Sequence, residues 1–297
     1  MPRSLDLPSS GPLEPWGAGS LLFVGTATTL LRFGGFTVLT DPNFLHRGEV
    51  AHFGWGLSAR RLTDPAVELV SLPDADFVLL SHLHEDHFDR VVERELAKDV
   101  PIVTTPHAAE ALARKAFTHT QPLETWESVS FSRGGHRLEV TSLPAQHGPR
   151  VVSRLLPPTM GSLLEFSDAR GRQLRVYFSG DTLVHEALRE IPRRFPDIDL
   201  AVLHLGGARV LGILVTLDAR QGVEALRLVD PKLAVPVHFD DYPLFKSSIE
   251  EFRRAVSRAG LDDKVHYLLR GETLHFHARP GLAAVETVTL PAPLGPP

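Results

Sequence analysis

Histidine is concentrated in one stretch of the chain, which reads Ser81-His82-Leu83-His84-Glu85-Asp86-His87. It follows the apolar run Phe77–Leu80, which predicts a buried strand. In an extended segment, side chains two residues apart project to the same side, so His82 and His84 can bind one ion together. As the chain turns into the following helix, Asp86 and His87 reach a neighbouring position. The loop therefore offers ligand pairs for two ions, and chance alone gives this spacing in roughly two of a thousand such chains.

The 297-residue chain has the composition of a folded globular protein, with 43% hydrophobic and 23% charged residues. A domain of this length buries roughly 75% of the surface that its unfolded chain would expose, so the core needs no disulfide or structural metal. There are 15 histidines and no cysteines. The absence of cysteine excludes disulfides, thiolate zinc sites, iron–sulfur clusters and cysteine nucleophiles. A bound metal must therefore be held by imidazole and carboxylate groups.

The charge and hydropathy of the chain bear on its partners and location. The formal net charge is −5, and Lys and Arg are scattered rather than clustered. No nucleic-acid partner is expected, because there is no basic stripe to follow a phosphate backbone. No apolar stretch approaches the ~18–20 residues that span a bilayer, and residues 1–20 lack a secretory signal pattern. We expect a cytoplasmic protein without a membrane span that acts on a small-molecule substrate; the sequence leaves its oligomeric state open.

Two halves of the chain resemble each other. Each contains predicted strands that lead to an aspartate, which is Asp41 in the first half and Asp181 in the second. These strands are 20–24, 28–33 and 36–40, then 161–166 and 173–178. In both halves an acidic residue, Asp76 or Asp199, then opens an apolar strand. Downstream, segments 99–107 and 230–238 match with equal spacing from aspartate to histidine, so the halves predict one repeated β-then-βα unit.

Helices are expected at about 88–98, 107–116, 219–229 and 247–259, the third with Asp218 and Gln221 as a capping box. Two mixed sheets packed face to face, with the helices outside, bury the apolar strands of both halves. We therefore expect an α+β fold with one domain over residues 18–278. The Pro-rich terminal segments, 1–17 and 279–297, are expected to be loosely ordered. Strand ends then meet along one edge, where loops converge on a site.

Further residues complete a family resemblance. Besides the histidine-rich loop, the chain contains Asp41 after the first hairpin, His147 in Pro-Ala-Gln-His, Asp181 in Ser-Gly-Asp-Thr and His238 in Pro-Val-His. In this order, over about residues 20–277, these sites resemble the five motifs of the metallo-β-lactamase-fold hydrolases. The resemblance implies a four-layer αβ/βα sandwich.

By position, the resemblance implies two divalent metal ions as cofactors. Asp181 bridges both ions, and each ion has three further ligands: His82, His84 and His147 for one, Asp86, His87 and His238 for the other. Asp41 is expected beside them, holding a ligating imidazole through its other ring nitrogen. Zinc is the first expectation, although manganese and iron suit the same donors.

The expected chemistry follows from the ion pair. Two adjacent divalent ions polarise a substrate oxygen and lower the pKa of a water caught between them from 15.7 toward ~7. The bridging hydroxide attacks a carbonyl or phosphorus centre. Asp86 and Asp181 are the expected catalytic residues, because Asp86 can orient the nucleophile and Asp181 partly neutralises the ions.

Within the superfamily, the chain most resembles the ascorbate-6-phosphate lactonase and N-acyl-phosphatidylethanolamine phospholipase D groups, through Asp41-Pro42, the Pro-Ala-x-His motif and Gly161-Ser162. These groups cleave different bonds, so we expect a hydrolase of an ester, lactone or phosphodiester in a small molecule or lipid-like substrate. Relatives that reduce dioxygen commonly carry Glu in place of His84 and depend on a flavin domain, and neither feature is present. A nuclease-type phosphodiesterase and a metal-binding sensor without turnover stay open as alternatives.

Loops around the metals are expected to select the substrate. Arg150, Arg154 and Arg209 can clamp a phosphate or carboxylate, or else face the solvent. Tyr242 can donate a hydrogen bond to a developing oxyanion, or else pack in the interior. Residues 48–57, a glycine-spaced loop with His52, Phe53 and Trp55, form either an apolar lid over the site or a packed surface loop.

Two further histidines stand close to the repeat. His107 corresponds to His238, but it is expected to be the first residue of a helix rather than a ligand. His204 ends the strand after Asp181, and its role stays open.

Overall fold

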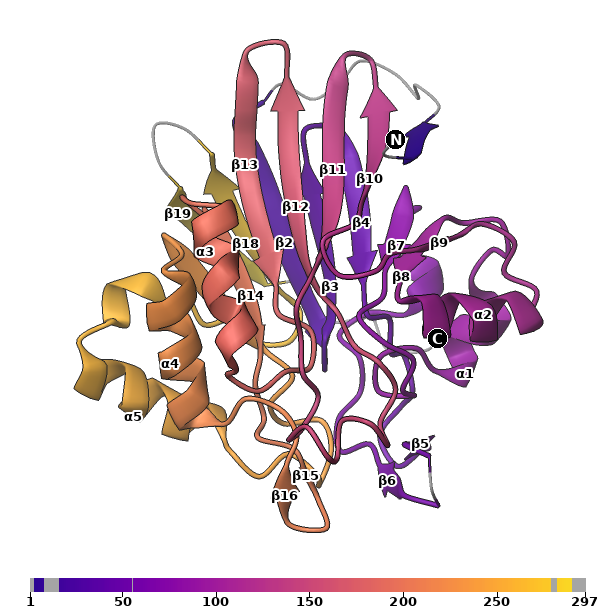
Figure 1. The fold of residues 1–297 in the computed structure, drawn as a ribbon, viewed down its shortest axis with the longest axis vertical. Helices are drawn as coiled ribbons and strands as arrows, with labels where there is room; N and C mark the ends of the chain where they lie inside the picture. Colours follow the sequence, from indigo (N-terminus) through magenta and orange to yellow (C-terminus); the bar gives the residue numbers. More distant parts are fainter. Residues whose placement is uncertain (1–2, 8–15, 55, 279–281, 290–297) are drawn as a thin grey trace, which may run out of the picture.

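Two β-sheets packed face to face form the centre of the protein (Figure 1). The computed structural model describes residues 3–7, 16–54, 56–278 and 282–289. Over these residues, one sheet has eight strands, in the order β19 (Ala283–Thr289), β18 (Glu272–His277), β2 (Ala18–Gly25), β3 (Thr28–Phe33), β4 (Phe36–Thr40), β7 (Phe77–Leu79), β8 (Ile102–Thr104) and β9 (Thr120–Pro122). The other has seven, in the order β1 (Arg3–Asp6), β10 (Ser128–Arg133), β11 (His136–Leu143), β12 (Gly161–Asp168), β13 (Gly171–Phe178), β14 (Leu200–His204) and β17 (Leu233–Val237).

Helices cover the outer face of each sheet. In Figure 1, α1 (Arg90–Glu95) and α2 (Pro106–Arg114) lie to the right, while α3 (Glu190–Arg194), α4 (Ala219–Val229) and α5 (Ile249–Ala259) lie together to the left. Three short 3-10 helices connect other elements: η1 (Leu69–Ser71), η2 (Glu186–Arg189) and η3 (Asp262–Lys264). Among the described residues no helix has the length and apolar character needed to cross a bilayer.

Apolar side chains hold four layers together. Between the sheets, the rings of Phe77 and Phe131 stack with their centroids 4.2 Å apart. Val92 of α1 and Leu112 of α2 pack on the eight-stranded sheet, and Phe252 of α5 packs with residues of α4 and the seven-stranded sheet. The expected α+β fold, a four-layer sandwich of two mixed sheets with helices outside, is confirmed.

The two halves meet at one edge of the sandwich. In the first half β4, β7 and β8 are parallel neighbours, and in the second β13, β14 and β17 are. The carboxyl ends of these strands therefore face the same edge. Two small hairpins lie there, β5 (Val50–His52) with β6 (Ser58–Arg60) and β15 (Arg209–Val210) with β16 (Ile213–Leu214), at the bottom of Figure 1.

Most predicted elements agree with the structure, and the differences arise at caps. Strands β3 and β4 and helix α4 have the predicted bounds. Helix α1 begins later than expected, because Asp89 accepts hydrogen bonds from the backbone N–H groups of Val91 and Val92 and so caps it. Asp218 caps α4 by accepting from Gln221 N, but the Gln221 side chain accepts from Val184 N instead of closing a capping box. His107 lies in the first turn of α2.

Parts of the terminal segments that were expected to be loosely ordered form strands, whereas residues 1–2, 8–15, 279–281 and 290–297 lie outside the described residues. β1 pairs with β10 at one edge of its sheet, and β19 pairs with β18 at the edge of the other. Leu5 and Leu282 also pack against the core between the sheets. A sheet edge offers unpaired backbone groups to any extended segment, so short strands form beside Pro-rich sequence that composition alone classifies as loose.

Candidate metal centre

The structure brings all seven predicted ligands together at the edge where the strands end. The loop after β7 carries His82, His84, Asp86 and His87, whereas His147 follows β11, Asp181 follows β13 and His238 follows β17. All seven side chains are buried. Residues from both halves of the chain therefore converge because their parallel strands end at the same edge.

Backbone geometry places two of these ligands. Gly180, immediately before Asp181, has φ +58°, and a Cβ there would lie 2.4 Å from the Met160 carbonyl oxygen. Only glycine fits at position 180, so the backbone requires Gly180 directly before the ligand Asp181. His238 itself has φ +64°, and its N–H donates to the Thr26 carbonyl at 2.7 Å. That bond ties the left-handed turn after β17 to the loop after β2.

One donor group consists of three imidazoles. His82 Nε2 and His84 Nδ1 lie 2.9 Å apart, and a nitrogen of His147 lies within 4.8 Å of both. His147 Nδ1 donates to the Val215 carbonyl at 2.9 Å, which leaves Nε2 free to ligate. His147 Nε2 is 3.8 Å from Asp181 Oδ2.

A second donor group faces the same aspartate. His238 Nε2 lies 3.3 Å from Asp86 Oδ2 and 3.8 Å from Asp181 Oδ1. His87 Nε2 lies 3.8 Å from Asp86 Oδ2 and 3.4 Å from Asp181 Oδ2. Asp181 therefore stands between the two groups, with side-chain oxygens near rings of both.

Asp41 and His204 lie behind the ligands. Asp41 Oδ1 accepts hydrogen bonds from Ser81 N at 2.8 Å and Ser81 Oγ at 2.9 Å, and lies 3.4 Å from His87 Nδ1. Its other oxygen lies 3.4 Å from His204 Nε2. Asp41 therefore orients His87 from the side away from Asp181. His204 faces Asp41 with its Nε2, and its ring lies 5.9 Å from the rings of His87 and His238.

The electrostatics of the centre favour a bound cation. Burial lowers the pKa of His82 well below its ordinary value and that of His84 to about 3, so these rings are neutral and able to ligate. Burial opposes ionisation of Asp181, but His238 and His87 hold its pKa well below the ordinary range. Burial also disfavours the charged form of His87, yet Asp181, Asp86 and Asp41 outweigh it and raise the pKa of His87 well above normal.

Several polar atoms in the centre have no hydrogen-bond partner among the described residues: Asp86 Oδ1, Asp181 Oδ1, His84 Nε2 and His87 Nε2. Buried polar atoms are nearly always paired. Unpaired carboxylate oxygen and imidazole nitrogen in one cluster are the donors that divalent transition metals take. The residues present therefore fit a metal centre, and their chemistry suits zinc, manganese or iron.

A narrow cavity opens over the donor atoms of His84, Asp86, His147 and Asp181. Its walls are apolar, and they come from separate segments: Phe53, Leu57, Leu156, Ala208, Val210, Val215, Leu244 and Phe245. An adjoining cavity of about 530 Å³ shares Phe53, His84 and Leu156 with it and extends to Arg154. The cavity directly over the centre is thus walled by apolar side chains, whereas the adjoining cavity has a mixed apolar and polar lining.

The predicted substrate-binding residues take different positions. Arg154 lines the adjoining cavity, whereas Arg150 is exposed and lines neither cavity. Arg209 does not lie where the sequence predicts. In β15 its neighbour Val210 lines the metal cavity, so the Arg209 side chain projects to the other side of the strand. There it lines a groove beside α4 and α5.

Tyr242 is the second correction. It is buried and does not line the metal cavity, and its hydroxyl donates to Asn43 Oδ1 at 3.2 Å. The ring packs against Phe53 and Phe245, with centroids 5.8 Å away in both cases. Tyr242 therefore supports two residues of the cavity wall, which is the packing alternative rather than the substrate contact.

The loop at residues 48–57 contributes to the cavity wall through Phe53 and Leu57. Phe53 follows β5 and its ring lies 6.1 Å from that of His84. Trp55 lies outside the described residues. Whether the loop moves as a lid stays a prediction.

Sequence reasoning missed Asn43, which connects the centre to its surroundings. Its Nδ2 donates to the Glu85 carbonyl at 2.7 Å and to Asp89 Oδ2 at 3.0 Å. Its Oδ1 accepts from the Thr26 hydroxyl at 3.1 Å and from Arg61 Nη1 at 2.5 Å. The only available signal was its position two residues after Asp41.

Comparisons with known proteins indicate what the chain is similar to. Residues 37–239 match the family model of the β-lactamase superfamily domain. The chain is 30% identical over 217 residues to a UPF0173 metal-dependent hydrolase of Archaeoglobus fulgidus, covering 68% of this chain and 83% of that protein. It is 25% identical over 233 residues to N-acyl-phosphatidylethanolamine-hydrolyzing phospholipase D 1 of Caenorhabditis elegans, covering 75% of this chain and 64% of that protein.

Among solved structures, the isothiocyanate hydrolase from Delia radicum gut bacteria has the same fold, with a TM-score of 0.74 and 22% identity over 87% of this chain and 99% of that one. The buried His/Asp cluster at the strand ends, together with relatives named metal-dependent hydrolases, places the protein in the class of metal-dependent hydrolases. The chain belongs to the β-lactamase superfamily within that class.

Proposed function

We propose that this protein hydrolyses an ester, lactone or phosphodiester bond of a small or lipid-like substrate at a centre of two divalent ions. One ion is assigned to His82, His84 and His147 and the other to Asp86, His87 and His238, with Asp181 between them. The observation that carries the proposal is the position of Asp181 between two groups of donors. Its carboxylate oxygens lie 3.4–3.8 Å from an imidazole Nε2 of each group. Zinc is proposed first, because imidazole and carboxylate donors suit it.

The chain's own residues have distinct tasks in this reaction. When bound, the ions supply a polarised substrate oxygen and a water of lowered pKa. Asp86 lines the cavity with an unpaired Oδ1, which can accept the proton of the attacking water. The apolar walls exclude bulk water and strengthen electrostatic interactions inside the cavity.

The substrate class follows from the surroundings of the centre. The adjoining cavity has an apolar part with Leu83, Phe88 and Leu156, and a polar part with both acidic and basic side chains, among them the exposed Arg154. An apolar portion of the substrate can lie in this cavity while Arg154 pairs with a phosphate or carboxylate. This arrangement supports a lipid-like substrate with an anionic group.

Asp86→Ala separates hydrolysis from metal storage. The substitution removes one ligand of the second donor group and leaves His82, His84 and His147 in place. We expect bound metal to fall by about one equivalent and hydrolysis to fall by roughly 10²–10³-fold, as for other groups that stabilise a transition state. Elemental analysis and a panel of esters, lactones and phosphodiesters, including an oligonucleotide, measure both.

The matched control is Asp74→Ala, an exposed aspartate outside the centre, which should leave metal content and rate unchanged. A wild-type protein that holds zinc or manganese and hydrolyses nothing in the panel would favour the sensor instead. Hydrolysis confined to the oligonucleotide would favour the nuclease.

Phe53→Ala tests the contribution of the 48–57 loop. Phe53 lines both cavities, so its loss should weaken binding of substrates with long acyl chains more than short ones. Burial of such a ring is worth about 1.5–3 kcal/mol, so we expect kcat/KM for a long-chain ester to fall roughly tenfold relative to a short-chain ester. Val70→Ala, at a residue 77% exposed, is the control. Equal losses for both esters would contradict a role of Phe53 in substrate selection.

A further inference from the structure

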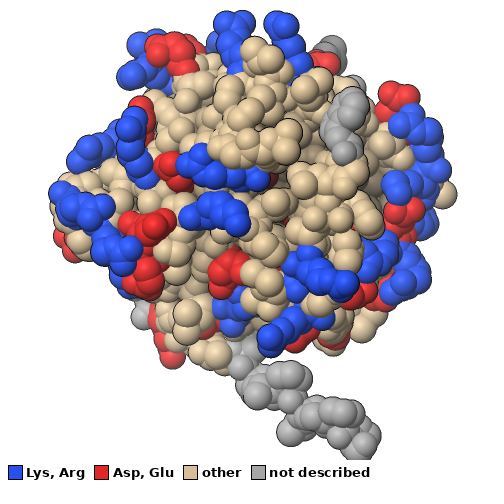
Figure 2. Space-filling view, turned by 90° about the horizontal axis from the view of Figure 1, so that it is seen from below, with Lys and Arg blue, Asp and Glu red and all other residues tan. Residues whose placement is uncertain are grey.

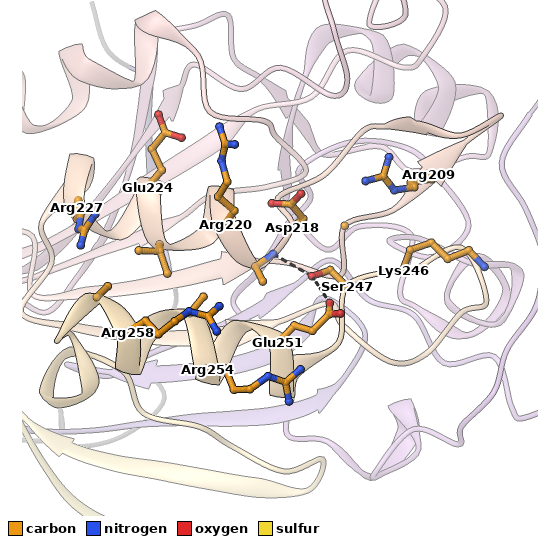
Figure 3. A pocket seen from close by; sticks show the side chains of 15 residues that line it. Arg209, Asp218, Arg220, Glu224, Arg227, Lys246, Ser247, Glu251, Arg254 and Arg258 are labelled. Atoms are coloured by element: carbon orange, nitrogen blue, oxygen red, sulfur yellow. Dashed lines mark hydrogen bonds between the residues drawn. The ribbon is translucent and has the colours of Figure 1, made fainter.

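A large charged groove lies between α4 and α5, on the other side of β15 from the metal cavity (Figure 3). Its volume is about 1040 Å³. Six cationic residues line it: Arg209, Arg220, Arg227, Lys246, Arg254 and Arg258. Figure 3 shows that Arg220 and Arg227 come from α4 and Arg254 and Arg258 from α5, with Arg209 and Lys246 beyond the first turns of the two helices. Both walls of the groove are therefore positive.

None of these six cations has a carboxylate ion-pair partner in the described part of the chain. Some arginines elsewhere are paired with carboxylates, as Arg90 is with Glu49 at 2.7 Å and Arg175 with Glu165 at 2.8 Å. Three acidic residues also line the groove, Asp218, Glu224 and Glu251, so its six cations exceed its carboxylates by three. Asp218 caps α4 by accepting from Gln221 N, and Glu251 completes the capping box of Ser248. On the left of Figure 2, over α4 and α5, Lys and Arg side chains surround a few acidic ones. A protein of net charge −5 thus has a groove whose lining carries an excess of positive charge.

The spacing of the cations matches an elongated anion rather than a single phosphate. Arg220 and Arg227 are seven residues apart on one helix, which is about 10 Å along its axis. Arg254 and Arg258, four apart, add a second row about 6 Å long. A single phosphate cannot reach both ends of these rows. A chain of several phosphates can, and guanidinium groups bind phosphate oxygens in pairs.

The lining also favours an oligophosphate over other polyanions. No aromatic side chain is among the described residues of the groove, so bases of a nucleic acid would find no stacking surface. The site is a concave groove between two helices, whereas a bilayer surface is flat. We propose that the groove between α4 and α5 is a binding site for a linear oligophosphate, separate from the metal centre.

Tripolyphosphate binding to the full-length protein tests this site. By titration calorimetry we expect a dissociation constant on the order of 100 µM or lower, with inorganic orthophosphate at least about tenfold weaker. Arg254→Glu combined with Arg258→Glu should weaken tripolyphosphate binding at least about tenfold. Both side chains are exposed and Glu is a good helix former, so the melting temperature should stay close to that of wild type.

Two controls make the result specific to the groove. Arg94→Glu combined with Arg114→Glu changes the net charge equally at exposed residues outside the groove and should leave the affinity within about twofold. Tripolyphosphate can also chelate metal ions at the metal centre, so His84→Ala is the second control. It alters that centre but not the groove, and should leave the affinity for tripolyphosphate unchanged. Loss of binding in His84→Ala with retention in the groove variant would overturn the proposal. Equal binding of orthophosphate, or a ten-nucleotide oligothymidylate that binds the same arginines more tightly, would overturn it as well.

Discussion

Replacement of Asp181 by Asn will reduce hydrolysis by about 10³-fold or more and lower the bound metal below that of any single histidine variant. Asp181 oxygens lie 3.4 Å from His87 Nε2, 3.8 Å from His147 Nε2 and 3.8 Å from His238 Nε2. Removal of a residue that only orients a ligand typically reduces metal affinity or activity about 10–100-fold. Asp181 contacts both donor groups directly, so its loss should cost more.

The reason is charge rather than shape. His238 and His87 hold the pKa of Asp181 well below its ordinary range despite burial, so the group is a carboxylate at neutral pH. Asn has the same size but no charge, and its amide nitrogen cannot ligate a cation. The substitution therefore removes an anionic ligand from a buried site that contains several imidazoles.

Metal content by elemental analysis and initial rates at saturating zinc or manganese measure the effect. Asp99→Asn, at an exposed aspartate, makes the same chemical change away from the centre and should behave as wild type. If Asp181→Asn kept both its metal and its rate, Asp181 would not lie between two ions and the proposed centre would be wrong.

The positions of the ligands were predictable because they depend on topology. In the first half an apolar strand leads into the His-rich loop, and in both halves a hairpin leads to an aspartate, Asp41 or Asp181. These patterns predict which residues reach the edge of the sandwich. His82 follows β7 of one sheet and His238 follows β17 of the other. They come together because the parallel strands of both sheets end at the same edge, which can be predicted without the side-chain packing. The internal repeat of the chain then indicated which residues of the second half correspond to those of the first.

The substrate-facing residues were not predictable, because they depend on which side of a short strand faces the site. Arg209 and Val210 are adjacent in β15, and a shift of one residue would exchange them. The turn before β15 determines which of the two residues faces the site. It contains Gly206 and Gly207, both with positive φ, and the sequence does not define the geometry of such a turn. Tyr242 was similarly ambiguous, since the buried Asn43 that accepts from its hydroxyl is distant in sequence.

A buried ion pair near the centre was also missed, although it joins both halves of the site. Arg61 and Asp241 are both fully buried, with Nη2 and Oδ1 3.5 Å apart. Asp241 Oδ2 accepts from Thr26 N at 2.8 Å, and the Thr26 carbonyl in turn accepts from His238 N. Arg61 Nη1 donates to Asn43, which holds the loop of His84 and Asp86 through the Glu85 carbonyl. The Arg61–Asp241 pair therefore helps to hold ligands from both halves of the chain, His84 and Asp86 from the first half and His238 from the second.

Asp241→Ala should lower the free energy of unfolding by about 3–5 kcal/mol, because it leaves the Arg61 guanidinium buried without its partner. The loss should also reduce metal affinity, since the turn that carries His238 is no longer held through Thr26. Urea denaturation measures the stability, with a chelator present in every sample so that bound metal does not contribute. Asp240→Ala is the matched control: its side chain is 48% exposed and pairs with Arg270 at the surface, so we expect a change under about 1 kcal/mol.

The pH dependence gives a second, independent measurement. Burial disfavours ionised Asp241, but Arg270 and Arg61 outweigh it and lower its pKa in the folded protein. A carboxyl whose pKa is lower in the folded state stabilises the protein above its unfolded value of about 3.9, and this stabilisation is lost as the pH falls through the folded value. The gap in unfolding free energy between wild type and Asp241→Ala should therefore be constant near neutral pH and narrow below about pH 4. A gap that persists unchanged in acid would mean that packing, rather than the buried charge, accounts for the role of Asp241.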